Sequence, residues 1–167
     1  MTKNGQLPRV VITGIGAVTP LAGTWPETWE ELVAGRSAGR SITHFDASEY
    51  PTQIAASVQN FRAADYMDAK EVKRLGAVTH FAWAAAQEAL AYSTLDLAYE
   101  DRERVGIELG SAFGALDIME DQVLTLHEGG PRRIKPSVAP SVLISTTPCY
   151  LAIQLGVQHF TQHVLVL

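Results

Sequence analysis

The chain has 167 residues, which is enough for one domain or for part of a larger one. Hydrophobic residues make up 47% of it and charged residues 19%, a globular composition that excludes an intrinsically disordered chain. The net charge of −5 excludes general nucleic-acid binding, because proteins of that class need a positive surface to displace counterions from phosphates.

The first predicted element is a strand over residues 10–13, where four consecutive residues form the β-branched run typical of a strand buried on both faces. Gly14 and Gly16 end this strand and predict a turn that faces a ligand. A helix is predicted over residues 25–34, because apolar residues recur there at near-helical spacing. Its end signals are Thr24 as N-cap, Pro26 in the first turn and Gly35 as a stop.

The middle of the chain predicts a surface excursion followed by a long helix. Residues 36–53 are mixed and turn-rich, and they lead to a possible strand over residues 54–58. Residues 69–92 have the longest helical pattern, with one apolar stripe that is rich in alanine. So much alanine predicts close packing of this helix against another element.

A second series of strand, glycine turn and helix follows. The strand is predicted over residues 105–109, and the helix over residues 116–126. Between residues 129 and 140, glycines and prolines predict an ordered loop, since each proline fixes φ and restricts the residue before it.

The last part of the chain predicts a helix and a buried strand. Residues 142–155 are mostly apolar with a helical course, and residues 164–167 have the pattern of a buried strand. Pro148 leaves two alternatives for the helix. Either the helix kinks there, or it begins there with Thr147 as N-cap and Pro148 at the N1 position.

Cys149 is the only cysteine, which excludes an intramolecular disulfide and a cysteine-based zinc site. We therefore expect a cytoplasmic protein, and neither a signal peptide nor a membrane span is predicted. For Cys149 itself, a buried structural thiol is favoured over a nucleophile, because no basic neighbour in the sequence would activate a thiolate.

The motifs predict neither a bound cofactor nor a metal ion. After Gly14 and Gly16, Thr19 stands where the dinucleotide-binding pattern needs a third glycine or alanine. The five histidines have no recurring metal-ligand spacing with carboxylate or cysteine partners. His159 and His163 are four residues apart, but the valines near them suggest an extended chain.

Lys70, Lys73 and Arg74 lie at i, i+3 and i+4 in the helix predicted over residues 69–92, so they project from one face. By spacing alone, a solvated helix face is the favoured interpretation. Cations near a helix N-terminus are unfavourable to the helix dipole, and their position is easier to understand if an anionic partner docks there.

Taken together, the chain resembles the N-terminal part of a β-ketoacyl-[acyl carrier protein] synthase, closest to the type II elongating condensing enzymes of fatty-acid synthesis. The resemblance covers nearly all of this chain but less than half of a family member. The matching blocks are Arg9–Gly16, Trp29–Ser37, His44–Asp46, Lys73–Leu75, Arg104–Gly106, Gly110–Ser111 and Gly129–Ile134 with Pro136 and Pro140.

The resemblance implies an α/β fold, the incomplete N-terminal half of a thiolase-like αβαβα layered fold, usually found in a homodimer. Residues 1–167 would then be one β-ketoacyl synthase domain, truncated before the nucleophile. In the family, a catalytic cysteine directly follows the strand that corresponds to residues 164–167, and two histidines and a lysine lie further on. This sequence contains none of the four, and Cys149 matches a small residue of the preceding helix, so the isolated chain is expected to be inactive.

The family loads an acyl group onto its cysteine, decarboxylates malonyl-carrier protein and joins the two groups. The partners implied are acyl carrier protein, acyl and malonyl thioesters and a second subunit, with no nucleic acid and no membrane. Lys70, Lys73 and Arg74 match the basic patch that docks the carrier protein, which reverses the preference drawn from spacing alone. Phe113 matches a bulky residue that lines or gates the acyl pocket.

The sequence also departs from the family pattern. Gly76 stands where an aspartate is common, and residues 148–150 replace small helix residues. His159 and Phe160 replace a Gly-Pro pair that leads into the nucleophile strand, so the last dozen residues are candidates for alteration by a reading-frame change.

Three hypotheses follow. The chain is a condensing-enzyme homologue without its nucleophile, or a non-catalytic module that binds carrier protein or a partner chain. The third is an unstable fragment, because an open sheet exposes strand edges and apolar faces.

Overall fold

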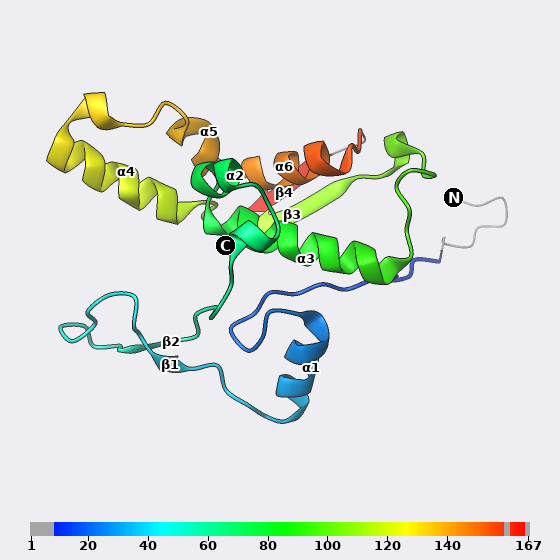
Figure 1. Cartoon of the computed structure of the whole chain (residues 1–167), viewed down its shortest axis with the longest axis horizontal. Coiled ribbons are helices and arrows are strands. Elements are labelled where there is room, and N and C mark those ends of the chain that lie inside the picture. Colours follow the sequence, from blue (N-terminus) through cyan, green and yellow to red (C-terminus); the bar gives the residue numbers. More distant parts are fainter. Residues whose placement is uncertain (1–8, 159–160, 166–167) are drawn as a thin grey trace.

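The computed structural model describes residues 9–158 and 161–165 of the chain (Figure 1). These residues form a mixed α/β arrangement of helices, four strands and short 3₁₀ turns. The helices are α1 (Trp25–Val33), α2 (Ala69–Arg74), α3 (Ala77–Ser93), α4 (Leu116–Gly129), α5 (Val138–Val142) and α6 (Thr146–Leu155). The strands are β1 (Arg40–Ser41), β2 (Ile54–Ala55), β3 (Ile107–Ser111) and β4 (Thr161–Leu165), and the turns are η1 (Ala63–Asp65), η2 (Arg102–Arg104) and η3 (Pro131–Arg133).

The strands β3 and β4 form a parallel pair, in which Ile107 is opposite Thr161 and Ser111 is opposite Leu165. Parallel neighbours need a crossover connection, and here the crossover contains α4, α5 and α6. α6 packs against both strands, and α3 packs against α6 (Figure 1). β3 confirms the second predicted strand, displaced toward its glycine turn. β4 overlaps the last predicted strand, of which residues 166–167 lie outside the described residues.

The helix predicted over residues 25–34 is confirmed as α1. Thr24 has the extended backbone of an N-cap (φ −131°, ψ 160°), and Pro26 lies in the first turn. Gly35 has φ +69°, directly after the C-cap residue Ala34. The strand predicted over residues 54–58 is shorter than expected, because β2 pairs antiparallel with only the two residues of β1.

The strand predicted over residues 10–13 is wrong for this structure. Val10 and Ile12 are 88% and 83% exposed, and the segment is not part of either described sheet. A β-branched run needs a neighbouring strand to bond its backbone groups, and among the described residues none pairs with this run. Its apolar side chains therefore remain at the surface.

The prediction that Gly14 and Gly16 form a turn facing a ligand is wrong, because both glycines lie against α3. A Cβ atom on Gly14 would overlap the carbonyl oxygen of Ala89, and one on Gly16 would overlap that of Ala85. Both alanines belong to α3, so the glycines allow the N-terminal segment to lie directly against the helix backbone (Figure 1). The close packing predicted for the alanine-rich stripe is confirmed.

The single helix predicted over residues 69–92 is wrong, because the chain breaks between α2 and α3. Leu75 is extended (φ −101°, ψ 148°), and α3 begins after Gly76. The break is stabilised from α4, where Asp117 Oδ2 accepts a hydrogen bond of 2.9 Å from the backbone N–H of Ala77. The carboxylate accepts from a backbone N–H of the first turn of α3, which has no partner within the helix. Its negative charge also interacts favourably with the positive end of the helix dipole.

The C-terminal helices follow the sequence pattern with shifted ends. α4 extends beyond the predicted residues 116–126, and α5 occupies part of the predicted proline-rich loop. α6 starts close to Pro148, as in the second of the two alternatives, but its N-cap is Ser145. Thr147 has another role, because its hydroxyl is 2.8 Å from the hydroxyl of Thr79 in a buried contact between α3 and α6.

The buried apolar cluster lies where α3 meets α6. It consists of Leu75, Tyr150 and Leu151, with Trp83 packed against it. The Trp83 and Tyr150 rings meet edge to face with centroids 5.9 Å apart. Because Leu75 belongs to this cluster, the end of α2 is fixed to the core.

His80 lies at the same junction and predicts a pH dependence. Burial lowers the pKa of His80, while Asp117 and the backbone carbonyls of Val72 and Leu75 oppose that effect. As the pH falls through the ordinary histidine value of about 6.5, the unfolded chain takes up this proton before the folded one does. The contribution of His80 to the free energy of unfolding is therefore fully present above that pH, and it decreases as the pH falls below it. Urea unfolding between pH 7.5 and 5.5 should show a larger loss for the native chain than for His80→Gln.

Candidate functional site

The three basic residues Lys70, Lys73 and Arg74 lie on α2, and all three side chains are exposed. Arg74 donates to Glu71 on the same helix, with 2.6 Å between Nη2 and Oε2. No ion pair within the described residues involves Lys70 or Lys73. Both ammonium groups are therefore available to an anionic partner.

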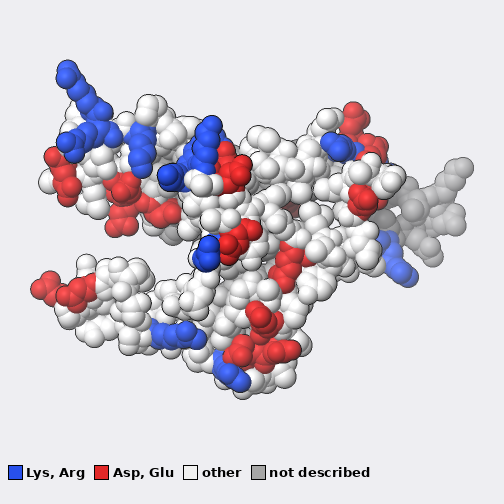
Figure 2. Space-filling model, in the orientation of Figure 1, with Lys and Arg blue, Asp and Glu red and all other residues white. Residues whose placement is uncertain are grey.

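A cavity of about 220 Å³ lies between α2, α4 and α5, and it is called the cationic cavity below. Lys73 and Arg74 line it, but Lys70 does not. Its lining residues are Lys73, Arg74, Asp117, Ile118, Asp121, Gln122, Lys135, Ser137, Val138 and Ser141. Figure 2 shows Lys and Arg side chains gathered over α2 and over the region of η3, with acidic side chains beside them.

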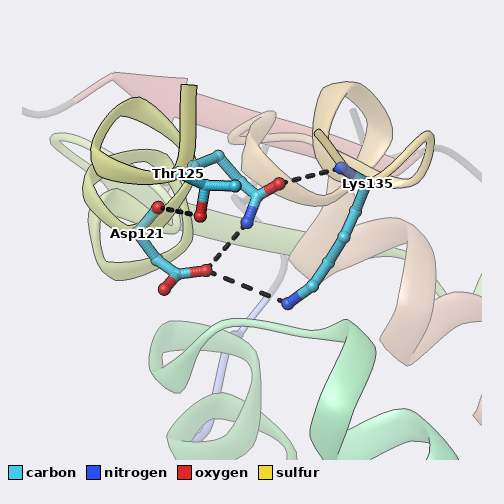
Figure 3. Close-up of polar contacts among 4 residues, drawn as sticks. Asp121, Thr125 and Lys135 are labelled. Carbon is cyan, nitrogen blue, oxygen red and sulfur yellow. Dashed lines mark hydrogen bonds and ion pairs between the residues drawn. The ribbon is translucent and has the colours of Figure 1, made fainter. Parts of the chain in front are cut away.

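Lys135 is the member of this site that the sequence analysis did not identify. Its backbone N–H donates to Gln122 Oε1 (2.9 Å), and Gln122 Nε2 donates to Asp121 Oδ2 (2.8 Å) (Figure 3). The Lys135 ammonium lies 3.8 Å from the same Asp121 oxygen, and Thr125 donates to the Asp121 carbonyl oxygen (2.8 Å). Gln122 is only 4% exposed, so this network holds the loop after η3 against α4.

The sequence contained one signal for Lys135. It follows Arg132 and Arg133 in a short basic run after Pro131. This basic run is far from α2 in the sequence, so no spacing rule connects the two. It reaches the site because η3 packs against α4. Three cationic side chains from two distant segments, Lys73, Arg74 and Lys135, therefore line one cavity.

Phe113 lies in the loop between β3 and α4, and it is 75% exposed. It is not among the residues that line the four described cavities. The structure therefore does not bring Phe113 together with the basic side chains, and its acyl-pocket role stays a prediction.

Cys149 is exposed, which corrects the prediction of a buried structural thiol. Its neighbours Thr147, Pro148 and Tyr150 are the buried residues of this part of α6, so Cys149 lies on the opposite, outer side. Its backbone N–H is already bonded to the Ser145 carbonyl oxygen (3.1 Å), which makes it unavailable to an oxyanion. The position lacks the free helix N-terminus that activates a catalytic cysteine.

Among the described residues, no three His, Cys, Asp or Glu side chains are grouped closely enough to hold a metal ion. His159 lies outside the described residues, and only the backbone of His163 is described, so the pair remains untested. Within the described part of the chain, no helix is both long and apolar enough to cross a membrane.

The structure of this chain is similar to parts of two solved ketosynthase structures. It is 23% identical to the ishigamide ketosynthase/chain length factor, with a TM-score of 0.83 over 93% of this chain and 39% of that one. It is 24% identical to a chain of AntDE:AntF, a type II polyketide synthase acyl-carrier protein in complex with its ketosynthase, with a TM-score of 0.76 over 91% of this chain and 40% of that one. The fold is therefore the N-terminal portion of a ketosynthase fold.

Sequence comparison agrees with the fold. A 3-oxoacyl-[acyl-carrier-protein] synthase 2 of Synechocystis is 35% identical over 92% of this chain and 37% of its own length. That of Coxiella burnetii is 39% identical over 82% of this chain and 33% of its own length. The chain thus spans about a third of the length of these relatives. The family model "Beta-ketoacyl synthase, N-terminal domain" matches residues 8–164, so this chain belongs to the beta-ketoacyl synthase family.

Proposed function

We propose that this chain provides the carrier-protein docking surface of a 3-oxoacyl-[acyl carrier protein] synthase, the enzyme that condenses acyl and malonyl thioesters in fatty-acid synthesis. The observation that carries the proposal is the cationic cavity, which gathers Lys73, Arg74 and Lys135 on a chain of net charge −5. Lys70 extends the same positive surface along α2. The names of the sequence relatives and the ketosynthase–carrier-protein complex among the structural neighbours support this function.

The electrostatics of the surface suit an acidic partner. Glu71 pairs with Arg74 at 2.6 Å, and Asp121 lies 3.8 Å from the Lys135 ammonium, so both of these cations already have an acidic neighbour. Lys73 is left to interact with a partner carboxylate or phosphate. Such complementary charges steer association and fix the register of the complex more than they increase affinity.

The remaining parts of the proposal concern the architecture. Residues 1–167 supply part of a β-ketoacyl synthase domain, from the first half of a thiolase-like αβαβα layered fold. A second copy or a partner chain covers the exposed apolar residues, which include Val10, Ile12 and Phe113. Phe113 lines or gates the acyl pocket of that assembly.

The proposal assigns no condensing activity to the isolated chain. The only cysteine, Cys149, is within α6 with its backbone N–H already bonded, so it provides neither the activated thiolate nor the oxyanion donor that acyl transfer requires. The purified chain, incubated with acyl- and malonyl-carrier protein, is expected to give no condensation product. Turnover by the chain alone would show that this assignment is wrong.

Carrier-protein binding is tested by titrating acyl carrier protein into the native chain and into Lys73→Glu. Charge reversal replaces an attraction with a repulsion, so affinity should fall about tenfold and the salt dependence should decrease. Arg40→Glu is the matched control, because Arg40 is an exposed cation on β1 that lines a different cavity. Equal affinities of the native chain and Lys73→Glu would reject the docking surface.

A further inference from the structure

The helix α2 presents the basic side chains, yet little of its own surface holds it in place. It has six residues, fewer than an isolated helix needs to be stable in water, and none of the six is buried. Its anchor is the residue that follows it, Leu75, which is 5% exposed and belongs to the core cluster. The order of α2 therefore depends on its junction with α3.

His80 lies at that junction with an unsatisfied ring nitrogen. Its Nε2 atom is buried, and within the described part of the chain it has no hydrogen-bond partner. The backbone carbonyls of Val72 and Leu75, at the end of α2, lie beside the ring. The end of α2 therefore supplies part of the cover that keeps water away from His80.

Protonation changes what the His80 ring needs from its surroundings. A neutral imidazole has one nitrogen without a hydrogen, so the buried Nε2 can stay unprotonated at neutral pH. The imidazolium has a hydrogen on both nitrogens, and the one on Nε2 would be a buried donor without an acceptor in a ring that is also charged. Both costs are removed when the ring reaches water, which requires the end of α2 to move away.

The charged groups described around the ring do not supply the missing acceptor. Asp117 of α4 attracts the charged form of His80, but burial has the larger effect and keeps the pKa of His80 below its ordinary value. Asp117 Oδ2 already accepts a hydrogen bond from the backbone N–H of Ala77 (2.9 Å). The other titratable groups at the junction are Asp68, Glu71, Lys73 and Arg74 from the α2 segment and Tyr150 from α6. Among all these residue types, only histidine has an ordinary pKa between about 5.5 and 7.5.

We propose that the junction between α2 and α3 is a pH-sensitive hinge, in which a proton taken up by His80 from solvent releases α2 and exposes the ring. At neutral pH, α2 is held against α3 and its basic side chains keep the arrangement described above. Below the ordinary histidine value of about 6.5, the open form binds the proton more tightly than the closed form, so the equilibrium shifts toward the open form. The consequence for carrier-protein binding rests on the proposed function, but the hinge itself does not.

Hydrogen exchange of the full chain, corrected for the intrinsic exchange rate at each pH, measures the opening of α2. The backbone N–H groups of Val72 and Leu75 are hydrogen-bonded along α2 (2.9 Å each), and that of Cys149 is hydrogen-bonded in α6 (3.1 Å). From about pH 7.5 to about pH 5.5, protection at Val72 and Leu75 should fall about fivefold, whereas protection at Cys149 should change by less than about twofold.

Two histidine variants and one measurement on the native chain identify the titrating group. His80→Gln removes it, so protection of α2 should vary by less than about twofold over the same range. His127→Gln is the matched control and should keep the native pH profile, because His127 is an exposed histidine in the last turn of α4. In the native chain, the NMR signal of the His80 ring should titrate below about pH 6.5, and the α2 amide signals should shift with the same midpoint.

Three results would overturn the hinge. They are constant protection of α2 in the native chain, an equal fall in α2 and at Cys149, and an unchanged pH dependence in His80→Gln. The exchange experiment contains no carrier protein, so the two proposals fail separately. If α2 opens with His80 while carrier protein binds equally to the native chain and to Lys73→Glu, the hinge stands and the docking surface is rejected.

Discussion

Replacing Gly16 by alanine should lower the free energy of unfolding by about 3 kcal/mol, the upper part of the range for overpacked sites. The added Cβ would overlap the Ala85 carbonyl oxygen and lie 2.7 Å from the Ala89 backbone nitrogen. These are backbone atoms of a hydrogen-bonded helix, so they cannot move aside as a flexible side chain would. The N-terminal segment must instead separate from α3 and lose its contacts there.

Gly23→Ala is the matched control for this substitution. A Cβ at Gly23 would meet no atom within 4 Å, and its φ is not in the left-handed region. Removing glycine there reduces the freedom of the unfolded chain, so stability should stay constant or rise by about 0.5 kcal/mol. Urea unfolding of both variants measures the difference. Equal stabilities of Gly16→Ala and Gly23→Ala would contradict the close packing seen at α3.

Local sequence signals predicted the elements whose ends depend on their own residues. α1 begins and ends where its capping residues, Pro26 and Gly35 indicate, because those signals act within one helical turn. The order of β3, a glycine turn and α4 was also predicted, since strand periodicity and glycine are local properties. These elements needed no information about the rest of the fold.

The wrong predictions depend on residues far away in the sequence. The break between α2 and α3 is stabilised by Asp117, forty positions after Ala77, and nothing near Leu75 in the sequence indicates that contact. The run at residues 10–13 has strand composition, but a strand exists only where another strand pairs with it. The exposure of Cys149 depends on which side of α6 faces α3, and that side contains Thr147, whose hydroxyl contacts Thr79.

The candidate site divides in the same way. The spacing of Lys70, Lys73 and Arg74 predicted a solvated face near the start of one long helix. All three side chains are exposed, but they lie on the short helix α2. The cavity was not predictable, because it requires Lys135 to reach α4 through the buried side chain of Gln122. A basic helix face becomes a candidate binding site only when tertiary contacts bring a second basic segment to it.

The N-terminal segment depends on α3 for electrostatic as well as steric reasons, and Glu88→Ala should show this. Glu88, on α3, accepts hydrogen bonds from the backbone N–H groups of Ala17 (2.8 Å) and Trp25 (2.9 Å). Trp25 is the first residue of α1, so its N–H has no partner within the helix and the Glu88 carboxylate supplies one. The negative charge also interacts favourably with the positive end of the α1 dipole. Losing both bonds to a partly buried carboxylate should lower the free energy of unfolding by about 2 kcal/mol.

Two further variants separate this tether from a general effect of losing a glutamate. Glu88→Gln keeps one acceptor oxygen and should lose about half as much stability, whereas Glu120→Ala, at an exposed position of α4, should change it by less than about 0.5 kcal/mol. Hydrogen exchange gives the local readout, because in Glu88→Ala the amides of Ala17 and Trp25 should lose protection while those of α6 keep theirs. If protection at those two amides were unchanged, α1 would be held to α3 by packing alone, and the carboxylate would be unnecessary to the contact that Gly16 makes possible.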